Sequence, residues 1–149
     1  MKDNELVLER IIDAPREKVF KAWTDPVHIG EWFGPTGFTI TTKSMDVKQG
    51  GRWIFTMHGP DGTDYASELT YIEIVAPERL VIGYNATPEF DLKEFSAVIT
   101  FEDVNGKTKL TLRHMFANAE ERVKQEKIGA VEGGEQTVGR LAEYLKKTQ

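Results

Sequence analysis

The spacing of hydrophobic positions predicts an opening strand, a short helical region, a long run of strands and a helical end. Apolar residues between Leu6 and Ile12 form the opening strand. From Phe38 onward, apolar and polar residues alternate as they do in half-buried strands. After Phe116, helix-forming residues dominate and apolar positions recur at helical spacing. This order indicates an α+β protein.

Two short helices are predicted between Pro15 and Phe33. Pro15 suits a first helical turn, where its missing N–H is not needed. The pair Asp25-Pro26 ends one helix and begins the next. The apolar faces of the two helices comprise Val19, Phe20, Trp23, Ile29, Trp32 and Phe33. Helices this short are unstable alone, so we expect them to pack against a larger element.

Six further strands follow the short helices. We place them at residues 38–47, 51–58, 64–75, 79–84, 95–102 and 108–116. The connections carry turn residues, and the Asn105-Gly106 pair is typical of a two-residue hairpin. Consecutive strands joined by such short turns predict an antiparallel meander.

The chain ends in a helical segment at residues 119–147, with an interruption near Gly129. At helical spacing, one side of this segment carries Val131, Gly134, Val138, Leu141 and Leu145. Because this side is apolar, we expect it to face the sheet.

The chain has 149 residues, enough for one domain with a substantial core, and we assign residues 1–149 to a single domain. Its formal net charge is -5. Nucleic acids and anionic membranes attract clustered Lys and Arg, whereas the basic residues here are interleaved with acidic ones. We therefore expect no nucleic-acid partner and no membrane partner.

The sequence contains no cysteine, which suits a reducing compartment. Acidic residues interrupt the N-terminal stretch from Met1 to Arg10, so it resembles neither a signal peptide nor a membrane span. These features predict a cytoplasmic location.

Several short motifs occur in a characteristic order along nearly the whole chain. They are Ala14-Pro15 with Val19 and Trp23, Thr24-Asp25-Pro26, Trp32-Phe33-Gly34-Pro35, Gly50-Gly51-Arg52-Trp53, Pro77-Glu78-Arg79-Leu80, and Gly133-Gly134-Glu135-Gln136-Thr137 before Arg140-Leu141. In order and spacing, the sequence resembles the activator of heat-shock-protein-90 ATPase (AHSA) type within the START and Bet v 1-like (SRPBCC) superfamily. The resemblance implies a helix-grip fold, in which a curved antiparallel sheet of about seven strands wraps around a long C-terminal helix. Two short helices follow the first strand.

The same resemblance implies a cavity between the sheet and the long helix. Relatives bind lipids, polyketides or hormones, and a minority catalyse reactions such as cyclisation or hydrolysis. We therefore expect a small hydrophobic or amphipathic ligand and no cofactor. Two alternatives are an enzyme of cyclase, hydrolase or lyase type and a chaperone-interacting module. The eukaryotic co-chaperone carries a second domain, whereas we expect a single domain here, which weakens the analogy.

Aromatic and small residues supply the candidate ligand site. The candidates are Trp23, Trp32, Phe33, Trp53, Phe55, Met57, Tyr84, His114, Gly134 and Val138. For any one aromatic residue, ordinary core packing is the favoured alternative. Burying such a side chain supplies about 1.5 to 3 kcal/mol without any ligand.

Gly134 and His114 each have two interpretations. Gly134 either leaves space for a ligand beneath the helix or permits close packing or a bend. An inward-facing His114 can hydrogen-bond a ligand, or act as a general base with Tyr65, Tyr71 or Tyr84. A core histidine with satisfied hydrogen bonds is the simpler alternative. We assign no catalytic residue, because no pair of residues occurs at a sequence spacing that indicates catalysis.

Two further points concern Glu68 and the other histidines. One register of the strand at residues 64–75 turns Glu68, Ile72 and Ile74 toward the concave side, and the other turns Tyr65, Leu69 and Tyr71 there. We favour an exposed Glu68, because a buried carboxylate needs a partner. His28 and His58 have no metal-ligand spacing with His114, so we predict no metal site.

Overall fold

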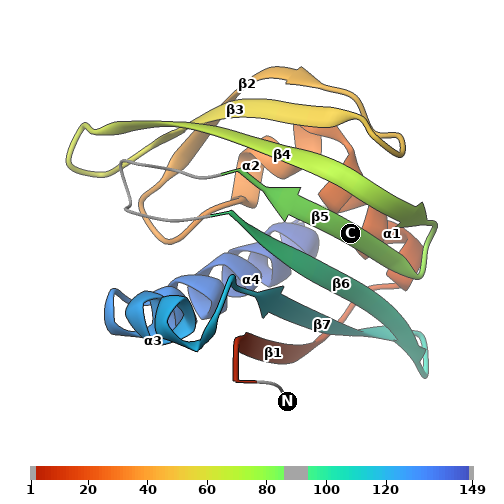
Figure 1. Ribbon diagram of the computed structural model, residues 1–149. Coiled ribbons are helices and arrows are strands. Elements are labelled where there is room, and N and C mark those ends of the chain that lie inside the picture. The colour runs from red at the N-terminus through yellow and green to blue at the C-terminus, as the bar shows by residue number, and fades with distance from the viewer. Residues whose placement is uncertain (1–2, 86–93, 148–149) are drawn as a thin grey trace.

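The structure is a computed structural model that describes residues 3–85 and 94–147. The strands are β1 (Glu5–Ile12), β2 (Thr39–Met45), β3 (Arg52–His58), β4 (Asp64–Val75), β5 (Arg79–Tyr84), β6 (Phe95–Val104) and β7 (Lys107–Met115). The helices are α1 (Arg16–Thr24), α2 (Pro26–Trp32), α3 (Ala119–Lys127) and α4 (Ala130–Lys147). The order of elements along the chain confirms the prediction from the sequence (Figure 1).

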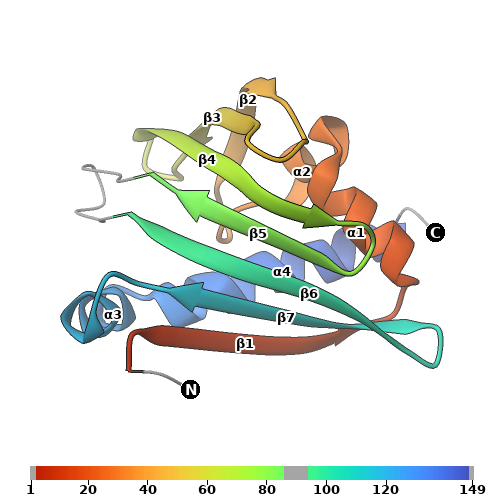
Figure 2. The ribbon, with the colours of Figure 1, turned by 45° about the vertical axis from the view of Figure 1, so that its right-hand side comes forward.

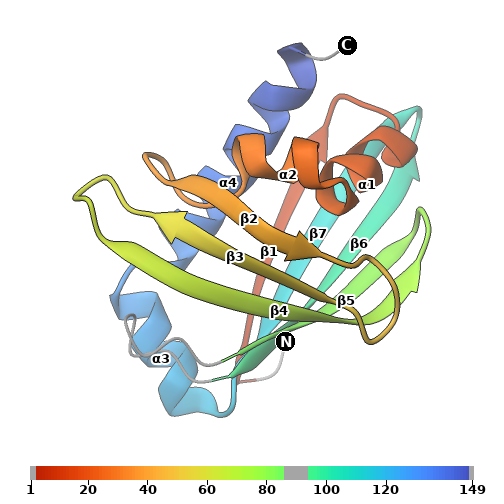
Figure 3. The ribbon, with the colours of Figure 1, turned by 90° about the horizontal axis from the view of Figure 1, so that it is seen from above.

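Within the described residues, seven strands form one antiparallel sheet in the order β1-β7-β6-β5-β4-β3-β2. The first and last strands pair, with Leu8 opposite Leu112. Figure 2 shows β4, β5, β6, β7 and β1 side by side, with α4 behind them. Viewed from above, the sheet curves around α4, while α2 lies beside β2 and α1 lies next to α2 (Figure 3). This arrangement confirms the helix-grip fold.

The predicted turns are present. Asn105 and Gly106 have φ angles of 54° and 84°, which suit a two-residue hairpin joining β6 to β7. Val104 therefore pairs directly with Lys107. Between β3 and β4, the Gly59 N–H donates to the Thr63 carbonyl oxygen at 2.7 Å. Such short connections make the meander.

The helices α1 and α2 meet at Asp25, as the sequence predicts. The Asp25 side chain accepts a hydrogen bond from the Val27 N–H at 2.9 Å, which caps α2. Aromatic side chains anchor both helices. The rings of Trp23 and Trp32 lie 4.8 Å apart between centroids, and Phe20 contacts the ring of Phe101 on β6 at 5.3 Å.

The C-terminal helical segment breaks at Gly129, whose φ of 98° favours glycine. The predicted interruption is confirmed, and Val138, Leu141 and Leu145 are buried in the hydrophobic core as expected. The expectation for Val131 is wrong, because this side chain is 39% exposed. It lies in the first turn of α4, directly after the break. Residue spacing identifies one side of a helix, but not how much of that side the sheet covers.

The register of β4 is the second of the two alternatives. Leu69 and Tyr71 are buried on the concave side, whereas Ile72 is 52% exposed. Glu68 lies on the opposite face and forms an ion pair with Arg52 at 3.3 Å. The outward-facing Glu68 is therefore confirmed.

Candidate functional site

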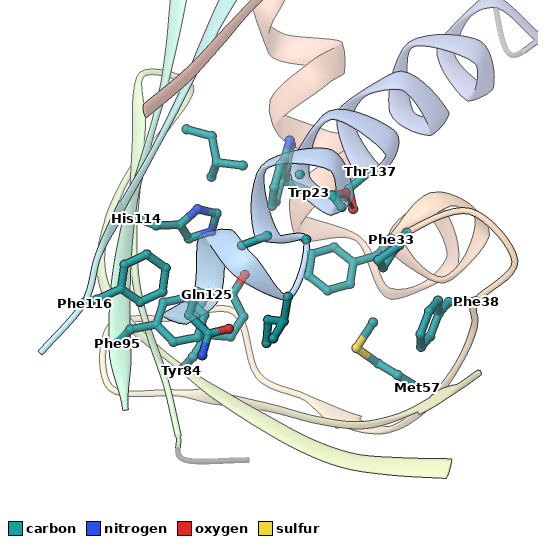
Figure 4. A pocket seen from close by; sticks show the side chains of 18 residues that line it. Trp23, Phe33, Phe38, Met57, Tyr84, Phe95, His114, Phe116, Gln125 and Thr137 are labelled. Atoms are coloured by element: carbon teal, nitrogen blue, oxygen red, sulfur yellow. Dashed lines mark hydrogen bonds between the residues drawn. The ribbon is translucent and has the colours of Figure 1, made fainter. Parts of the chain in front are cut away.

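A cavity of about 280 Å³ lies beneath the first half of α4 (Figure 4). The sheet side contributes Met57, Tyr84, Phe95, Leu112, His114 and Phe116. The loop after α2 contributes Phe33, Gly34, Pro35 and Phe38, and the helices contribute Trp23, Gln125, Ile128, Gly129, Ala130, Gly133, Gly134 and Thr137. The cavity thus lies where the sheet, α4 and the short helices meet.

Four rings from the sheet side form an aromatic wall, which we define as Tyr84, Phe95, His114 and Phe116. Tyr84 and Phe95 stack with centroids 4.4 Å apart and planes 13° apart. Phe95 also contacts His114 at 5.5 Å and Phe116 at 5.3 Å between centroids. Figure 4 shows these rings on one side of the cavity. Their edges and faces give the cavity an extended aromatic surface.

The opposite side of the cavity carries Phe33, Phe38 and Met57 (Figure 4). Phe33 also belongs to the core, because its ring contacts Trp53 at 5.0 Å and Phe55 at 5.9 Å between centroids. It therefore marks the boundary between the cavity and the filled interior.

Arg140 of α4 holds the loop that forms this side. Its Nη1 donates to the carbonyl oxygens of Gly34 and Pro35 at 2.9 Å each, and to that of Phe33 at 3.4 Å. Desolvation by burial lowers the pKa of Arg140 from its ordinary value. Gln136 adds a further contact, since its Oε1 accepts from the Thr36 N–H at 3.1 Å. The cavity wall is thus fixed to the helix.

His114 is the polar ring of the aromatic wall. Neither of its nitrogens hydrogen-bonds to another described residue. Burial among apolar groups lowers the pKa of His114 to about 4, because desolvation disfavours the charged imidazolium. At neutral pH the ring is therefore uncharged, with one nitrogen able to donate and the other able to accept a hydrogen bond.

Of the three tyrosines considered with His114, Tyr84 lines the cavity. Burial raises the pKa of its phenol, and its ring centroid lies 6.5 Å from that of His114. Tyr71 lies in the core, where burial and then the neighbouring Tyr84 raise its pKa. Its hydroxyl has no hydrogen-bond partner among the described residues. Tyr65 contacts the ring of Phe38 at 6.1 Å.

Gly133 and Gly134 lie where α4 passes over the cavity. A Cβ atom added to Gly134 would lie 3.7 Å from the nearest atom of Leu8, and one added to Gly133 would lie 3.6 Å from Pro35. Both are ordinary van der Waals distances, so a methyl group fits at either position. Close helix-to-sheet packing is therefore not what requires glycine here. Because glycine has no side chain, these two positions leave the cavity beneath α4 unfilled.

The structure places the candidate residues in two groups. Lining the cavity are Trp23, Phe33, Met57, Tyr84, His114 and Gly134. Away from the lining, in the filled core, are Trp32, Trp53, Phe55 and Val138, each no more than 3% exposed. The sequence pattern identified these four as apolar and inward-facing, but it does not distinguish a filled interior from a hollow one.

Sequence reasoning missed Phe38, Phe95, Phe116 and Gln125 as lining residues. A signal for two of them was present. The Asn105-Gly106 turn fixes the register of β6 against β7, which places Ala97 opposite His114. Continuing that register brings Phe95 next to Phe116, beside His114. Gln125 had no comparable signal, because it depends on how α3 folds back from Gly129.

No group of three or more His, Cys, Asp or Glu side chains in the described parts of the chain could hold a metal ion. His58 bonds instead to Asp64 and Thr41, at 2.7 Å each. The Nδ1 atom of His28 lies 2.5 Å from the hydroxyl oxygen of Tyr144. Among the helices within residues 3–85 and 94–147, none is long and apolar enough to cross a membrane.

A curved antiparallel sheet that encloses a long helix above an aromatic cavity defines the helix-grip class of proteins. Comparison with protein families gives a match over residues 13–146 to the family described as "Activator of Hsp90 ATPase homolog 1-like protein". The chain belongs to this family, which is part of the SRPBCC and Bet v 1-like superfamily. None of the curated proteins matches the chain.

Solved structures share the fold over almost the whole chain. A crystal structure of a Nitrosomonas europaea protein is 24% identical, has a TM-score of 0.89, and covers 99% of this chain and 97% of its own. A solution structure from Arthrobacter aurescens is 23% identical, with a TM-score of 0.90 and coverages of 97% and 87%. A solution structure of an AHSA1-like protein from Aeromonas hydrophila is 19% identical, with a TM-score of 0.76 and coverages of 97% and 93%. Identities this low establish the fold alone.

Proposed function

We propose that this protein binds a small hydrophobic or amphipathic molecule in the cavity beneath α4. The observation that carries the proposal is an aromatic wall facing open space of about 280 Å³ under a pair of helical glycines. Protein interiors are normally close-packed, and unfilled apolar space costs stability. A ligand that filled this space would recover the lost contacts. We place this activity in the cytoplasm, which suits a cysteine-free chain.

The ionisable groups of the cavity favour binding over acid–base turnover. With a pKa of about 4, His114 is a weak base at neutral pH. Burial raises the pKa of Tyr84, which makes its phenol a weak acid. Both groups are thus held neutral, a state suited to hydrogen-bonding a ligand.

The test begins with native mass spectrometry of freshly purified protein, followed by a thermal-shift screen of small aromatic and aliphatic compounds. A ligand at about one hundred times its dissociation constant should stabilise the protein by about 2.7 kcal/mol. For a chain of this size we expect a rise in Tm of several degrees.

Two variants of α4 locate the site. Gly134→Leu places a large side chain at the cavity and should weaken any ligand found at least about tenfold, a loss of about 1.4 kcal/mol. Gly139→Leu makes the same change on the same helix outside the cavity lining and should bind as the wild type does. A folded Gly134→Leu protein with undiminished affinity would contradict the cavity as the binding site.

The second candidate function is association with an Hsp90-type chaperone. The family description, which names the activator of Hsp90 ATPase, supports it. The test measures ATP hydrolysis by purified Hsp90 with and without this protein. Stimulation that persists in Gly134→Leu would favour a surface-mediated chaperone role over ligand binding. Absence of both stimulation and complex formation would reject it.

A further inference from the structure

The volume of the cavity limits how much of a ligand it can enclose. An apolar cavity of about 150 Å³ accommodates one benzene molecule, as known from an engineered cavity in another protein. A volume of about 280 Å³ is close to twice that. It also lies just below the range of about 300 to 1,000 Å³ that holds drug-sized ligands. The space therefore suits a compact molecule of about two fused rings better than a long acyl chain.

The walls favour a flat molecule. Tyr84 and Phe95 are nearly parallel, and His114 and Phe116 stack with their planes 29° apart. The opposite side offers the ring of Phe38 and the thioether of Met57, a group that contacts aromatic rings favourably. A planar aromatic molecule between these two sides would contact rings or sulfur on both faces.

The environment disfavours charge. The lining side chains within the described residues are all uncharged. An ionised ligand would therefore leave water without gaining a charged partner among them. The same cost of desolvating a charge lowers the pKa of His114 to about 4.

His114 and Tyr84 are the polar groups available to orient a neutral ligand, since the Nε2 of Gln125 donates to the Glu121 carboxylate at 3.4 Å. Among the other polar side chains of the lining, Thr137 already donates to the Gly133 carbonyl oxygen at 2.9 Å. The Nε1 atom of Trp23 is buried and has no hydrogen-bond partner among the described residues. His114 points into the space and has no hydrogen bond to a described residue (Figure 4). Its unprotonated nitrogen is an acceptor for a ligand hydroxyl.

We propose that the cavity selects a compact, uncharged aromatic molecule of about two fused rings whose hydroxyl group donates a hydrogen bond to His114. This inference rests on the proposed function, because it names the ligand class of the same cavity.

The experiment measures the affinities of four probes at neutral pH by isothermal titration calorimetry. The probes are naphthol, naphthalene, naphthoate and dodecanoate. We expect naphthol to bind tightest. Naphthalene, which lacks the hydroxyl, should bind about tenfold more weakly, as expected for a hydrogen bond worth about 1.4 kcal/mol. The anionic naphthoate and dodecanoate should bind more weakly than naphthalene.

Variants of His114 test the role of the imidazole. His114→Phe should reduce naphthol binding to the naphthalene level and leave naphthalene unchanged. His114→Gln retains an acceptor and should recover part of the preference for naphthol, which also serves as the measurement if the Phe variant fails to fold. His58→Phe is the matched control, since that imidazole bonds to Asp64 outside the cavity lining. It should keep the wild-type order of affinities.

The outcomes separate this inference from the proposed function. If naphthoate or dodecanoate binds most tightly and Gly134→Leu abolishes that binding, the cavity binds ligands but the inferred class is wrong. If naphthol and naphthalene bind equally in wild-type protein, the role of His114 is wrong. If none of the four probes binds and no co-purified molecule is found, both the inference and the proposed function are rejected.

Discussion

Beneath the C-terminal half of α4 the interior is filled, whereas beneath its N-terminal half it is open. The filled interior, which we call the packed end, includes Trp53, Phe55, Leu141 and Leu145, and each of these four side chains is at most 3% exposed. The rings of Trp53 and Phe55 stack with centroids 3.7 Å apart. At the cavity end, defined by the lining residues under Gly134, about 280 Å³ is unfilled. One helix and one sheet thus enclose two different interiors.

The difference arises from side-chain size on α4. At the packed end the helix buries the side chains of Val138, Leu141 and Leu145, whereas at the cavity end it carries Gly133 and Gly134. Helix formation favours alanine over glycine by about 0.8 to 1 kcal/mol at each such position. We therefore expect the packed end to determine stability and the cavity end to determine binding. Substitutions at the two ends should separate these properties.

The largest effect should come from the packed end. Trp53 is fully buried, and its Nε1 donates to the Thr42 hydroxyl at 3.1 Å. Trp53→Ala removes these contacts and leaves a cavity, so we expect a loss of about 3 to 5 kcal/mol in the free energy of unfolding. Urea denaturation followed by circular dichroism measures it.

Met57→Ala is the comparison from the cavity end, because Met57 also lies on β3 but faces the open space. We expect it to cost well under half as much stability. Equal losses at the two positions would show that the two ends do not differ as described.

The sequence predicted the elements of the fold, but not which part of the interior is filled and which part is open. The strands, the Asn105-Gly106 hairpin and the break at Gly129 were predictable, because alternation and turn chemistry are local signals. Periodicity also identified Trp53 and His114 as inward-facing. It gave no means of telling that Trp53 fills the core while His114 lines a cavity. That distinction depends on which helical residue lies opposite each strand position.

The register of β4 illustrates the same limit. Simple alternation assigns large apolar residues to both faces of this strand, with Leu69 and Tyr71 on one and Ile72 and Ile74 on the other. In the structure a bulge between Tyr71 and Glu73 breaks the alternation, so Ile74 pairs with Leu80 and packs against the core. Pairing with β3, which sets Leu69 opposite Trp53, decides between the two faces. Such pairing is a tertiary property, so composition alone left both registers open.

The second prediction concerns pH and His114. Its pKa is about 4 in the folded protein, against an ordinary value of 6.5. Between these values the unfolded chain binds a proton that the native state does not, so stability falls as pH is lowered from 6.5 to 4. Below about 4 both states are protonated and this contribution changes no further. The full loss is about 3 kcal/mol.

Urea denaturation at neutral pH and near pH 5 measures this effect in wild type and His114→Phe. Carboxylates contribute to both proteins, so the difference between their pH dependences isolates the imidazole. We expect the variant to lose less stability on acidification. If stability depended on pH in the same way in both proteins, the pKa of His114 would not be lowered by burial in the cavity.

The third prediction concerns the boundary between the two ends. Arg140→Met removes the hydrogen bonds to the carbonyl oxygens of Gly34 and Pro35 but keeps most of the aliphatic volume. Hydrogen bonds to charged groups contribute about 1.5 to 3 kcal/mol, so we expect a loss in that range together with weaker naphthol binding. Arg10→Met, in the same surface cleft, is the control and should affect neither. A loss of stability with unchanged naphthol affinity would show that the loop held by Arg140 does not shape the binding site.

The smallest effect should be a gain in stability at the cavity end. Gly134→Ala adds a methyl group that meets Leu8 at an ordinary contact distance of 3.7 Å. Alanine is the better helix former, and it restricts the unfolded chain, so we expect stabilisation of about 0.4 to 1 kcal/mol. Gly139→Ala on the same helix should give a comparable gain.

Binding is what should distinguish these two alanine variants. The methyl group at Gly134 enters the space that we assign to the ligand, so naphthol affinity should fall there and remain unchanged in Gly139→Ala. Thermal denaturation and calorimetry on both proteins measure the two properties together. A destabilised Gly134→Ala protein would instead indicate that glycine serves close packing at this position. A stabilised Gly134→Ala protein with weakened naphthol binding would mean that glycine at this position lowers helix stability but leaves space for the ligand.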